Sequence, residues 1–582
     1  MNILIPIIVA LPIFFLGYKL YAKYIARVFG EDDKNPTPAV AINDGVDYCP
    51  TKPIILFGHH FASIAGAGPI IGPTVALAFG FIPVWLWIVL GCIFIGAVHD
   101  FTALFASIRE KGKSIAEIAK GVLGKPGFLL FIGFTILMLL TVTSAFLNLT
   151  AIALTSLVPL HILGLPEDQT LLKVIGDKAQ IGGIASTSVI IITALAPFLG
   201  FLVYKKGINP IIAAVLAIII CLASINIGLV FPVSLTPETW MIILTIYTVI
   251  AAGIPVWIIL QPRDFTNSFL LYAGILGLFL GSIVCGIKGM NFSMPSFNIQ
   301  EGTQKLGLIW PFLFITVACG AISGFHCLVA GGTTSKQIMK ETQVKKVGYG
   351  GMLLEGMFAL GVLIAVASLD LKHYFDIVFP ADPTVKSNPV LAFSLSMGNL
   401  LNNAFGIPNA YGCIFGILLV EGFVITSLDT AIRLNRYLFE ELWANIFKSP
   451  PKFLKSYTFN SFLSAGLMFL LAYHNTFLKI WPVFGSANQL LAALALIAVS
   501  VWLINKGKKY WFTIIPAIFM MLTTICSLGH LLVKKYLPAK NYTLLTTDVL
   551  LIILAIGVIW LSVKKGVSVR LSHSTKIFVD RK

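Results

Sequence analysis

Charged residues are scarce in this chain of 582 residues. Asp, Glu, Lys and Arg together make up 11% of it, whereas a soluble globular protein has roughly 25%. Hydrophobic residues make up 57%, which is more apolar surface than water tolerates. A bilayer accepts such a surface, because lipid tails solvate apolar side chains that point outward. The shortage of charge therefore nearly excludes a soluble enzyme and predicts a membrane protein.

Cysteine pairs and phosphate-binding loops are also missing. The eight cysteines stand singly, mostly inside apolar runs, so we interpret them as small buried hydrophobic residues without a disulfide or metal framework. No GxxxxGK[ST] motif occurs, which argues against ATP-driven transport by this chain alone. The net charge of +16 does not predict nucleic-acid binding, because the Lys and Arg residues stand in short bursts between apolar segments.

Long apolar stretches are what the chain has in abundance. Stretches of about 18 to 25 residues predict an all-α polytopic membrane protein with about fifteen transmembrane helices. The first stretch runs into the basic segment YKLYAKYIARVFG, so we interpret it as a retained helix rather than a signal peptide. The predicted spans are 3–26, 54–78, 83–108, 127–156, 184–204, 208–231, 240–261, 268–288, 309–335, 347–370, 410–432, 457–475, 484–505, 511–533 and 545–563.

The distribution of basic residues predicts the orientation. If the N-terminus lies outside, most of the 41 Lys and Arg residues fall in loops on the cytoplasmic side, as the positive-inside rule requires. We therefore expect a multi-pass protein of the cell (inner) membrane with a cytoplasmic C-terminus. Lys534, Lys535 and Lys540 fall outside in this arrangement.

Two glycine-rich segments indicate an internal repeat. FGHHFASIAGAGPIIGP and CGAISGFHCLVAGGTTS each place a histidine, His60 or His326, six residues before a glycine, Gly66 or Gly332. Two further echoes follow in the same order: Thr143-Ser144 with Thr426-Ser427, and Asn209 with Asn488. The two units start an odd number of helices apart, so the second is expected to be inverted, as in secondary transporters.

The repeat suggests four parts of the chain. They are an N-terminal helix and loop (1–53), a first repeat unit with two extra helices (54–308), a second unit (309–510), and C-terminal helices with a basic tail (511–582).

Glycine-rich breaks in membrane helices predict a substrate site. A break leaves backbone N–H and C=O groups that lipid cannot satisfy, so it persists only where it lines a cavity or binds something. The half-helix ends then suit an anionic group or a cation. Close packing through small residues is the alternative. The candidate substrate-binding residues are His59, His60, Gly66, Gly68, Gly331, Gly332, Thr333, Thr334, Asn488 and Gln489.

Ionisable residues at membrane depth predict ion coupling, because a charge there is costly and usually serves a pathway or a partner. Asp429 can alternatively form a helix-end pair with Arg433. Glu355 and Glu421 have no cation nearby in sequence, and a histidine can switch charge near neutral pH. A buried structural role is the alternative for each. The candidates for ion coupling are Asp100, His326, Glu355, Glu421, Thr426, Ser427 and Asp429.

Motifs along nearly the whole chain resemble those of the carbon starvation protein A (CstA) family. They are FGHHFASIAGAGPIIGP, GAVHDF, GGTTSKQI, VITSLDTAIRLNRYLFEE and WPVFGSANQLLAALAL. The resemblance implies an inner-membrane transporter for peptides or, in some members, pyruvate. It also implies membership of the amino acid, polyamine and organocation superfamily.

That superfamily implies a LeuT-like core of two inverted five-helix units. Gly66 to Gly68 would then break the first core helix and Gly331-Gly332 the sixth, while Thr426 and Ser427 would lie where sodium-coupled relatives hold a cation. Extra helices between and after the units fit a seven-plus-seven arrangement equally well.

The sequence therefore predicts a secondary active transporter that imports a small carboxylate-bearing nutrient during carbon starvation. We expect no catalytic residue, cofactor or bound metal, and coupling to protons or sodium. Oligomeric state stays open. The alternatives are a membrane-embedded haem or metal protein that uses the intramembrane histidines, and a starvation sensor without transport.

Overall fold

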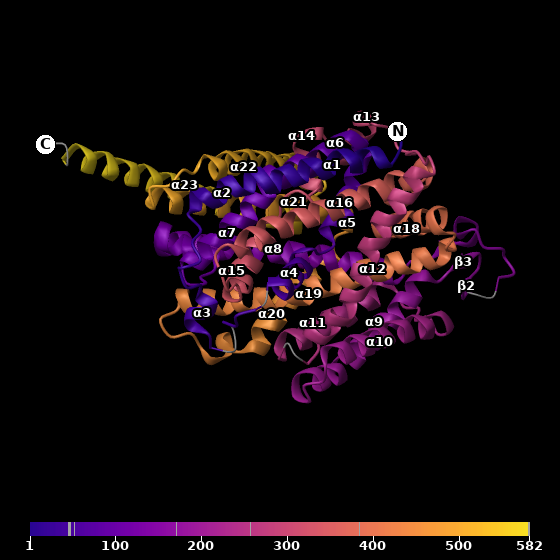
Figure 1. The fold of residues 1–582 in the computed structure, drawn as a ribbon. Helices are drawn as coiled ribbons and strands as arrows, with labels where there is room; N and C mark the ends of the chain where they lie inside the picture. Colours follow the sequence, from indigo (N-terminus) through magenta and orange to yellow (C-terminus); the bar gives the residue numbers. More distant parts are fainter. Residues whose placement is uncertain (45–47, 52, 170–171, 256–257, 383–384, 580–582) are drawn as a thin grey trace.

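The computed structural model describes residues 1–582 except 45–47, 52, 170–171, 256–257, 383–384 and 580–582. Most of its long helices run along one common direction (Figure 1). In chain order the α-helices are α1 Leu4–Leu16, α2 Ala22–Phe29, α3 Pro38–Ile42, α4 Pro53–Ile64, α5 Gly68–Ala76, α6 Phe81–Gly91, α7 Ala97–Arg109, α8 Ile115–Leu154, α9 Ile181–Gly200, α10 Pro210–Val230, α11 Pro237–Gly253, α12 Leu260–Ile287, α13 Ile299–Leu306, α14 Ile309–Thr316, α15 Phe325–Gly332, α16 Gly350–Ala367, α17 Leu371–Val378, α18 Pro389–Phe405, α19 Asn409–Ile446, α20 Tyr457–Tyr473, α21 Phe477–Asn505, α22 Trp511–Leu531 and α23 Tyr542–Val579.

A small antiparallel sheet lies at one end of the molecule, beyond the C-terminal end of α8 (Figure 1). Its three strands have two residues each and the order β1-β3-β2. Their bounds are Val158–Pro159, Val174–Ile175 and Lys178–Ala179.

The prediction of an all-α polytopic membrane protein is confirmed. Within the described residues, 11 helices are long and apolar enough to cross a membrane, and each coincides with a predicted span. The remaining four predicted spans take other forms. Two correspond to α11 and α20, which have 17 residues each, and the other two are broken helices.

The helices differ sharply in how much of their surface the protein covers. In α21, 94% of the apolar stretch is buried, against 28% in α10 and in α23. The outer helices therefore present apolar side chains outward, as expected where lipid is the solvent. The central helices include α8, α16, α19 and α21, and these surround the two broken helices.

The first broken helix lies where the sequence predicts it. Helix α4 ends at Ile64, residues 65–67 are not helical, and α5 begins at Gly68. Pro69 occupies the first turn of α5, where its missing N–H costs nothing. The predicted break at Gly66 to Gly68 is therefore confirmed as a structural feature.

The second break lies elsewhere than predicted. Helix α14 ends at Thr316 and α15 begins at Phe325, so the chain is interrupted over residues 317–324. The prediction of a break at Gly331 and Gly332 is wrong, because these glycines form the last turn of α15. The segment that does break, VACGAISG, is rich in small residues and precedes His326.

Helix α18 was not predicted. Asn388, which caps its N-terminus, donates to Ser156 just after α8, while Lys288 just after α12 donates to Asn403 near its C-terminus. The ends of α8 and α12 lie toward the end of the molecule that holds the N-terminus (Figure 1). Helix α18 packs along α19. Its Asn and Ser residues hide it from a count of apolar stretches.

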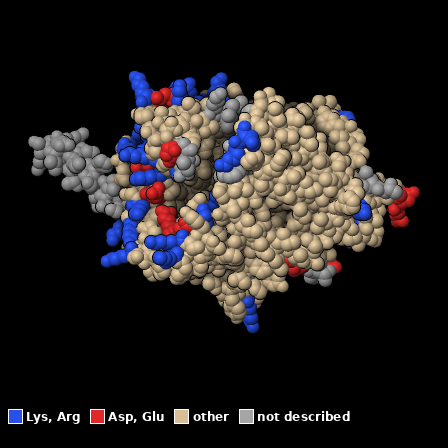
Figure 2. Space-filling view, turned by 90° about the horizontal axis from the view of Figure 1, so that it is seen from below, with Lys and Arg blue, Asp and Glu red and all other residues tan. Residues whose placement is uncertain are grey.

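The two chain ends lie at opposite ends of the helical bundle (Figure 1). Figure 2 shows that Lys and Arg side chains gather at one end, the end from which the C-terminal helix extends. Lys111, Lys448, Lys455 and Lys506 are among the exposed lysines of the described residues. Charge is thus segregated along the same direction in which the helices run.

The three sequence echoes have different structural settings. Thr143-Ser144 and Thr426-Ser427 lie on α8 and α19, two long central helices that pack together. Asn209 is an exposed cap at the start of α10, whereas Asn488 is fully buried in α21. The third pair therefore does not occupy equivalent environments, and the inverted repeat stays a prediction.

Candidate functional site

The two helix breaks meet in the centre of the molecule. Gly68 lies against Cys319, so a Cβ atom at position 68 would collide with that cysteine. A Cβ on Gly72 would lie 3.0 Å from the carbonyl oxygen of Thr316. The first turns of α5 therefore pack directly on the second break. Glycine is required because only a residue without a side chain lets the two backbones approach so closely.

Neighbouring helices satisfy the backbone of the second break. The Asn488 side chain accepts from the Phe325 N–H at 3.0 Å and donates to the Ser323 hydroxyl at 3.1 Å. The Gln489 side chain donates to the carbonyl of Phe314 at 2.6 Å. Trp481 donates to the carbonyl of Thr316. These α21 side chains supply the partners that lipid cannot provide. The predicted substrate residues Asn488 and Gln489 thus hold the break in place.

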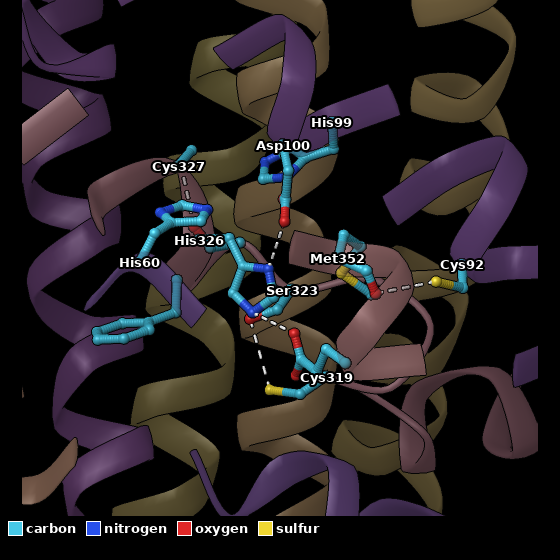
Figure 3. Close-up of polar contacts among 12 residues, drawn as sticks. His60, Cys92, His99, Asp100, Cys319, Ser323, His326, Cys327 and Met352 are labelled. Atoms are coloured by element: carbon cyan, nitrogen blue, oxygen red, sulfur yellow. Dashed lines mark hydrogen bonds and ion pairs between the residues drawn. The ribbon is translucent and has the colours of Figure 1, made fainter. Parts of the chain in front are cut away.

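A buried charged cluster lies beside this break (Figure 3). His326, the second residue of α15, places Nδ1 2.8 Å from Oδ2 of Asp100 on α7. His99 places its own Nδ1 2.8 Å from Oδ1 of the same carboxylate. All three side chains are at most 1% exposed. Asp100 therefore fixes the orientation of two imidazoles, each of which donates from Nδ1 when the carboxylate is ionised.

Glu355 faces the other side of the His326 ring. Its Oε2 lies 3.2 Å from Nε2 of His326, and both side chains are fully buried. The pair is close but poorly aligned, so neither Nε2 nor either Glu355 oxygen makes a well-formed hydrogen bond within the described residues. One proton placed on either atom favours the pair, because two bare acceptors facing each other in a dry site repel. The geometry is therefore that of a proton-holding pair.

The same corner can hold a divalent metal ion. Sγ of Cys319, a nitrogen of His326 and an oxygen of Glu355 all lie within 4.8 Å of one another. Nitrogen and oxygen ligands of a tetrahedral zinc ion lie about 3.3 Å apart, close to the 3.2 Å found here. Asp100 bonds the other nitrogen of His326, as second-shell carboxylates do in zinc sites. Cys319, His326 and Glu355 can therefore bind a metal ion, and His326 and Glu355 can equally share a proton.

His60 and His59 have separate environments. His60 is fully buried in α4, and its Nδ1 lies 2.8 Å from the Thr334 hydroxyl, which follows α15. This contact ties the two broken helices together. His59 is exposed on α4 and does not join the His60 contact.

The predicted residues at the end of α15 lie away from the break. Gly331 packs against the backbone of residues 113–115, with contacts of 3.1 to 3.3 Å from its Cβ position. Gly332 has open space at its Cβ position. Thr333 donates to the carbonyl of Val329 in its own helix. The structure therefore gives these three residues no contact with the second break.

The first break adjoins the predicted cation-binding hydroxyl pair. A Cβ atom on Gly66 would lie 2.8 Å from Oγ of Ser427 on α19. Thr426 points instead to a second charged cluster, in which its hydroxyl donates to Asp264 at 2.8 Å and accepts from Arg263 at 3.2 Å. The structure thus brings together the break and the hydroxyl pair, together with two charged residues that sequence reasoning missed.

Arg263 is the centre of this second cluster. Its side chain is buried in the first turn of α12, and its Nη1 lies 2.8 Å from Oδ2 of Asp429. Tyr247 of α11 accepts from Arg263 and donates to Asp429. The alternative interpretation of Asp429, a helix-end pair with Arg433, is wrong, because Arg433 donates to carbonyls at the end of α11. The only sequence feature that marked Arg263 is the motif QPRDF, which resembles an ordinary charged loop.

Glu421 stands apart from both clusters. It is fully buried on α19, and neither carboxylate oxygen has a hydrogen-bond partner among the described residues. An unpaired ionised carboxylate at this depth is very costly, so a protonated state is favoured. Among the described residues, no charged side chain forms a hydrogen bond or ion pair with it.

Comparison with known proteins decides the family. The sequence profile described as Carbon starvation protein CstA matches residues 2–387 and 378–527. The chain belongs to this family. It is 32% identical to "Peptide transporter CstA" of Bacillus subtilis over 99% of the chain and 100% of that protein. The resemblance noted from the sequence motifs is therefore confirmed.

Relatives within the family carry two different descriptions. The chain is 31% identical to "Pyruvate/proton symporter BtsT" of Escherichia coli, over 90% of the chain and 81% of that protein. It is 30% identical to "Peptide transporter CstA" of the same organism over 90% of the chain and 80% of that protein. These relatives are transporters, and the prediction of a transporter rather than an enzyme is confirmed.

A manganese transporter from Eremococcus coleocola is among the similar solved structures. It is 10% identical, covers 88% of this chain and 95% of its own, and has a TM-score of 0.45. This likeness is too weak to support an argument about core topology.

Proposed function

We propose that the protein is a secondary active transporter that imports a small carboxylate-bearing nutrient, pyruvate or a short peptide, by proton symport. The observation that carries the proposal is the buried triad of Asp100, His326 and Glu355 at the meeting point of the two broken helices. Such a triad is costly in a membrane unless it serves a pathway. The family relationship supports transport as the activity.

His326 can carry a proton between carboxylates on two helices that belong to different parts of the fold. Asp100 on α7 accepts from one ring nitrogen, and Glu355 on α16 faces the other. Protonation of the His326–Glu355 pair removes one negative charge from the cluster. Because His326 is carried by the broken helix, a change in its charge alters the attraction that holds α15 between α7 and α16. Proton binding is thereby linked to the position of the break.

The substrate is expected at the two breaks, where backbone and small side chains replace regular helix. The N-terminal ends of α5 and α15 carry positive dipole ends that suit a carboxylate. Pyruvate and peptides both carry that group. A peptide also brings an ammonium group, for which Glu421 is the unpaired buried carboxylate on the adjoining central helix.

The orientation follows from charge. We infer that the basic end of the molecule faces the cytoplasm and that the N-terminus lies outside, in the inner membrane. The gathering of Lys and Arg at the C-terminal end (Figure 2) supports this arrangement.

The test is uptake of labelled pyruvate and of a labelled dipeptide into proteoliposomes. A proton gradient and a sodium gradient are imposed separately, each with an ionophore control. Accumulation of one solute that follows the proton gradient and collapses with the protonophore is expected. Failure of both solutes to accumulate under either gradient, with protein shown to be folded and inserted, would contradict the proposal.

The metal-binding geometry of Cys319, His326 and Glu355 favours a second candidate, a protein with a resident divalent metal. Elemental analysis of purified protein separates the two. A stoichiometric metal ion that Cys319→Ser removes would favour the metal site. If the purified protein contains no metal ion and still transports, the triad serves proton binding and not metal binding.

A further inference from the structure

Arg436, near the C-terminal end of α19, is a buried cation that lacks a hydrogen-bond acceptor. The residue is 4% exposed, and its Nε has no hydrogen-bond partner among the described residues. Oε1 of Glu440, one turn further along α19, lies 3.8 Å from Nε, which is an ion pair but too long for a hydrogen bond. A guanidinium is a strong donor, and burying it without acceptors is costly. The site therefore calls for an oxygen acceptor beyond those that the described residues supply.

Two tyrosine rings hold the guanidinium of Arg436. Its central carbon lies 4.1 Å from the ring centre of Tyr437 on α19 and 4.7 Å from that of Tyr457 at the start of α20. Such cation–π contacts orient a guanidinium without using its N–H groups. Both tyrosines are exposed, so they form the rim of a site that opens at the surface. The donors of Arg436 are thus held ready for an anionic oxygen group.

A second arginine lies close to the first on α19. Arg433 precedes Arg436 by three residues, a spacing that makes two side chains neighbours on a helix surface. Its Nη2 donates to carbonyls at the end of α11, and its Nε has no hydrogen-bond partner among the described residues. Glu440 is the only acidic side chain in the described part of the chain that forms an ion pair with either arginine. The pair therefore keeps an excess of positive charge that favours an anion.

The surroundings of Arg436 are typical of the level of the lipid headgroups. The connection between α19 and α20 lies at the same end of the molecule as the C-terminus (Figure 1), where Lys and Arg side chains gather (Figure 2). Phe447 and Phe453 in this connection are exposed, and amphipathic and aromatic rings collect at the membrane–water interface. Further along, α20 exposes Phe462 and Leu470. An anion at Arg436 would therefore have an apolar helix surface nearby for acyl chains.

We propose that Arg436, together with Arg433, binds the phosphate group of an anionic phospholipid. A guanidinium matches the geometry of phosphate oxygens and binds two of them at once. Basic sites between membrane helices hold anionic headgroups in the same way. Helix α19 also carries Thr426 and Asp429, so a lipid bound here fixes the end of a helix that reaches the second charged cluster. The site is separate from the triad of Asp100, His326 and Glu355 and does not depend on the transported solute.

The experiment measures the melting temperature of the full-length protein, purified and delipidated in detergent, without substrate. Phosphatidylglycerol, phosphatidylcholine and inorganic phosphate are added separately, and bound lipid is measured by mass spectrometry. Phosphatidylglycerol should bind saturably and raise the melting temperature by about 2 to 4 °C, whereas the other two should not. An equal rise with phosphatidylcholine would overturn the proposal, because it would reflect lipid in general. A rise with inorganic phosphate alone would overturn the assignment to a lipid.

Variants distinguish this role from a purely structural one. A structural Arg436 would join α19 to α20 equally in any lipid, so Arg436→Gln would lower the melting temperature and keep the rise with phosphatidylglycerol. The proposal predicts that folded Arg436→Gln loses this rise. Lys448→Gln, which removes the same charge from an exposed lysine just after α19, should keep it. A rise that persists in folded Arg436→Gln would overturn the proposal.

Glu440→Gln keeps the proposal testable if Arg436→Gln does not fold. It removes the carboxylate that competes with phosphate for Arg436, at a position that is only partly buried. Half-maximal stabilisation should then need about 2- to 5-fold less phosphatidylglycerol, as loss of a weak ion pair allows. An unchanged or higher requirement would contradict the proposal. Each of these readouts is independent of uptake, so failure of the transport assay and failure of this inference are separable.

Discussion

Replacing Asn488 by leucine tests whether α21 holds the second break in place. Asn488 is fully buried, and its amide serves the Phe325 N–H and the Ser323 hydroxyl. Leucine has a similar size and no polar atom. It would leave a buried backbone N–H and a buried hydroxyl without their partner.

The expected cost follows from the loss of these two hydrogen bonds. Each unsatisfied buried polar group costs about 1 to 3 kcal/mol, and Ser323 keeps its contact with Cys319. We therefore expect Asn488→Leu to destabilise the protein by about 2 to 4 kcal/mol. In a chain of this size that lowers the apparent melting temperature by a few degrees. Uptake should fall further, because Cys319 and His326 flank the loosened segment.

Asn226→Leu is the matched control for this change. Asn226 lies on the exposed side of α10, and its side chain donates to Leu222 in the same helix. The same substitution there should change neither melting temperature nor uptake. Equal melting temperatures for both variants, with wild-type uptake by Asn488→Leu, would refute the assignment of Asn488 to the break.

Three further predictions concern packing, pH and topology. Gly68→Ala should reduce uptake, because the added methyl group collides with Cys319. Cys319→Gly in the same chain should restore part of the uptake. If uptake is not restored, the two breaks do not pack as described. Burial raises the pKa of Glu31 above 4.5, so the folded protein retains a proton there that the unfolded chain loses. The stability contributed by Glu31 should therefore fall as the pH rises above 4.5, and thermal melts of Glu31→Gln should lack this part of the slope. A reporter that is active only in the cytoplasm should be active when fused to the C-terminus, and a reporter that is active only outside the cell should be active when fused to the N-terminus. The reverse pattern would contradict the orientation.

Much of the fold follows from the sequence because the bilayer imposes simple rules. Long apolar stretches have to be helical, and loops have to be polar, so the spans at α8, α16, α19 and α21 lie where expected. The first break was predictable as well, because Gly66, Gly68 and Pro69 stand together within an apolar run. Local composition was sufficient in these cases.

The second break shows where local composition fails. Two small-residue segments, 317–324 and 331–334, lie within one apolar run, and only tertiary contacts choose between them. Asn488 donates to Ser323 and Gln489 donates to Val317 in the first segment, which stabilises an open backbone there. Their distance along the chain concealed this role, so the sequence suggested substrate binding for both.

The charged residues show the same difference between what local sequence reveals and what depends on tertiary contacts. Asp100, His326 and Glu355 were each identified from burial in apolar stretches, but their convergence depends on three separate helices. Arg263 was missed because it follows a helix boundary and resembles an ordinary loop cation. A charge near a predicted span end can therefore be drawn into the core by partners such as Asp429, which the sequence places far away.

Substrate-driven proton entry into proteoliposomes is the measurement that tests the central claim most directly. Wild type, Glu355→Gln and Glu421→Gln are compared with a pH-sensitive dye in the lumen, after addition of the solute that accumulates. The account predicts that wild type acidifies the lumen when the solute is added. Glu355→Gln should remain folded and exchange solute without proton entry. Full proton entry through Glu355→Gln would contradict the assignment of the His326–Glu355 pair to proton coupling.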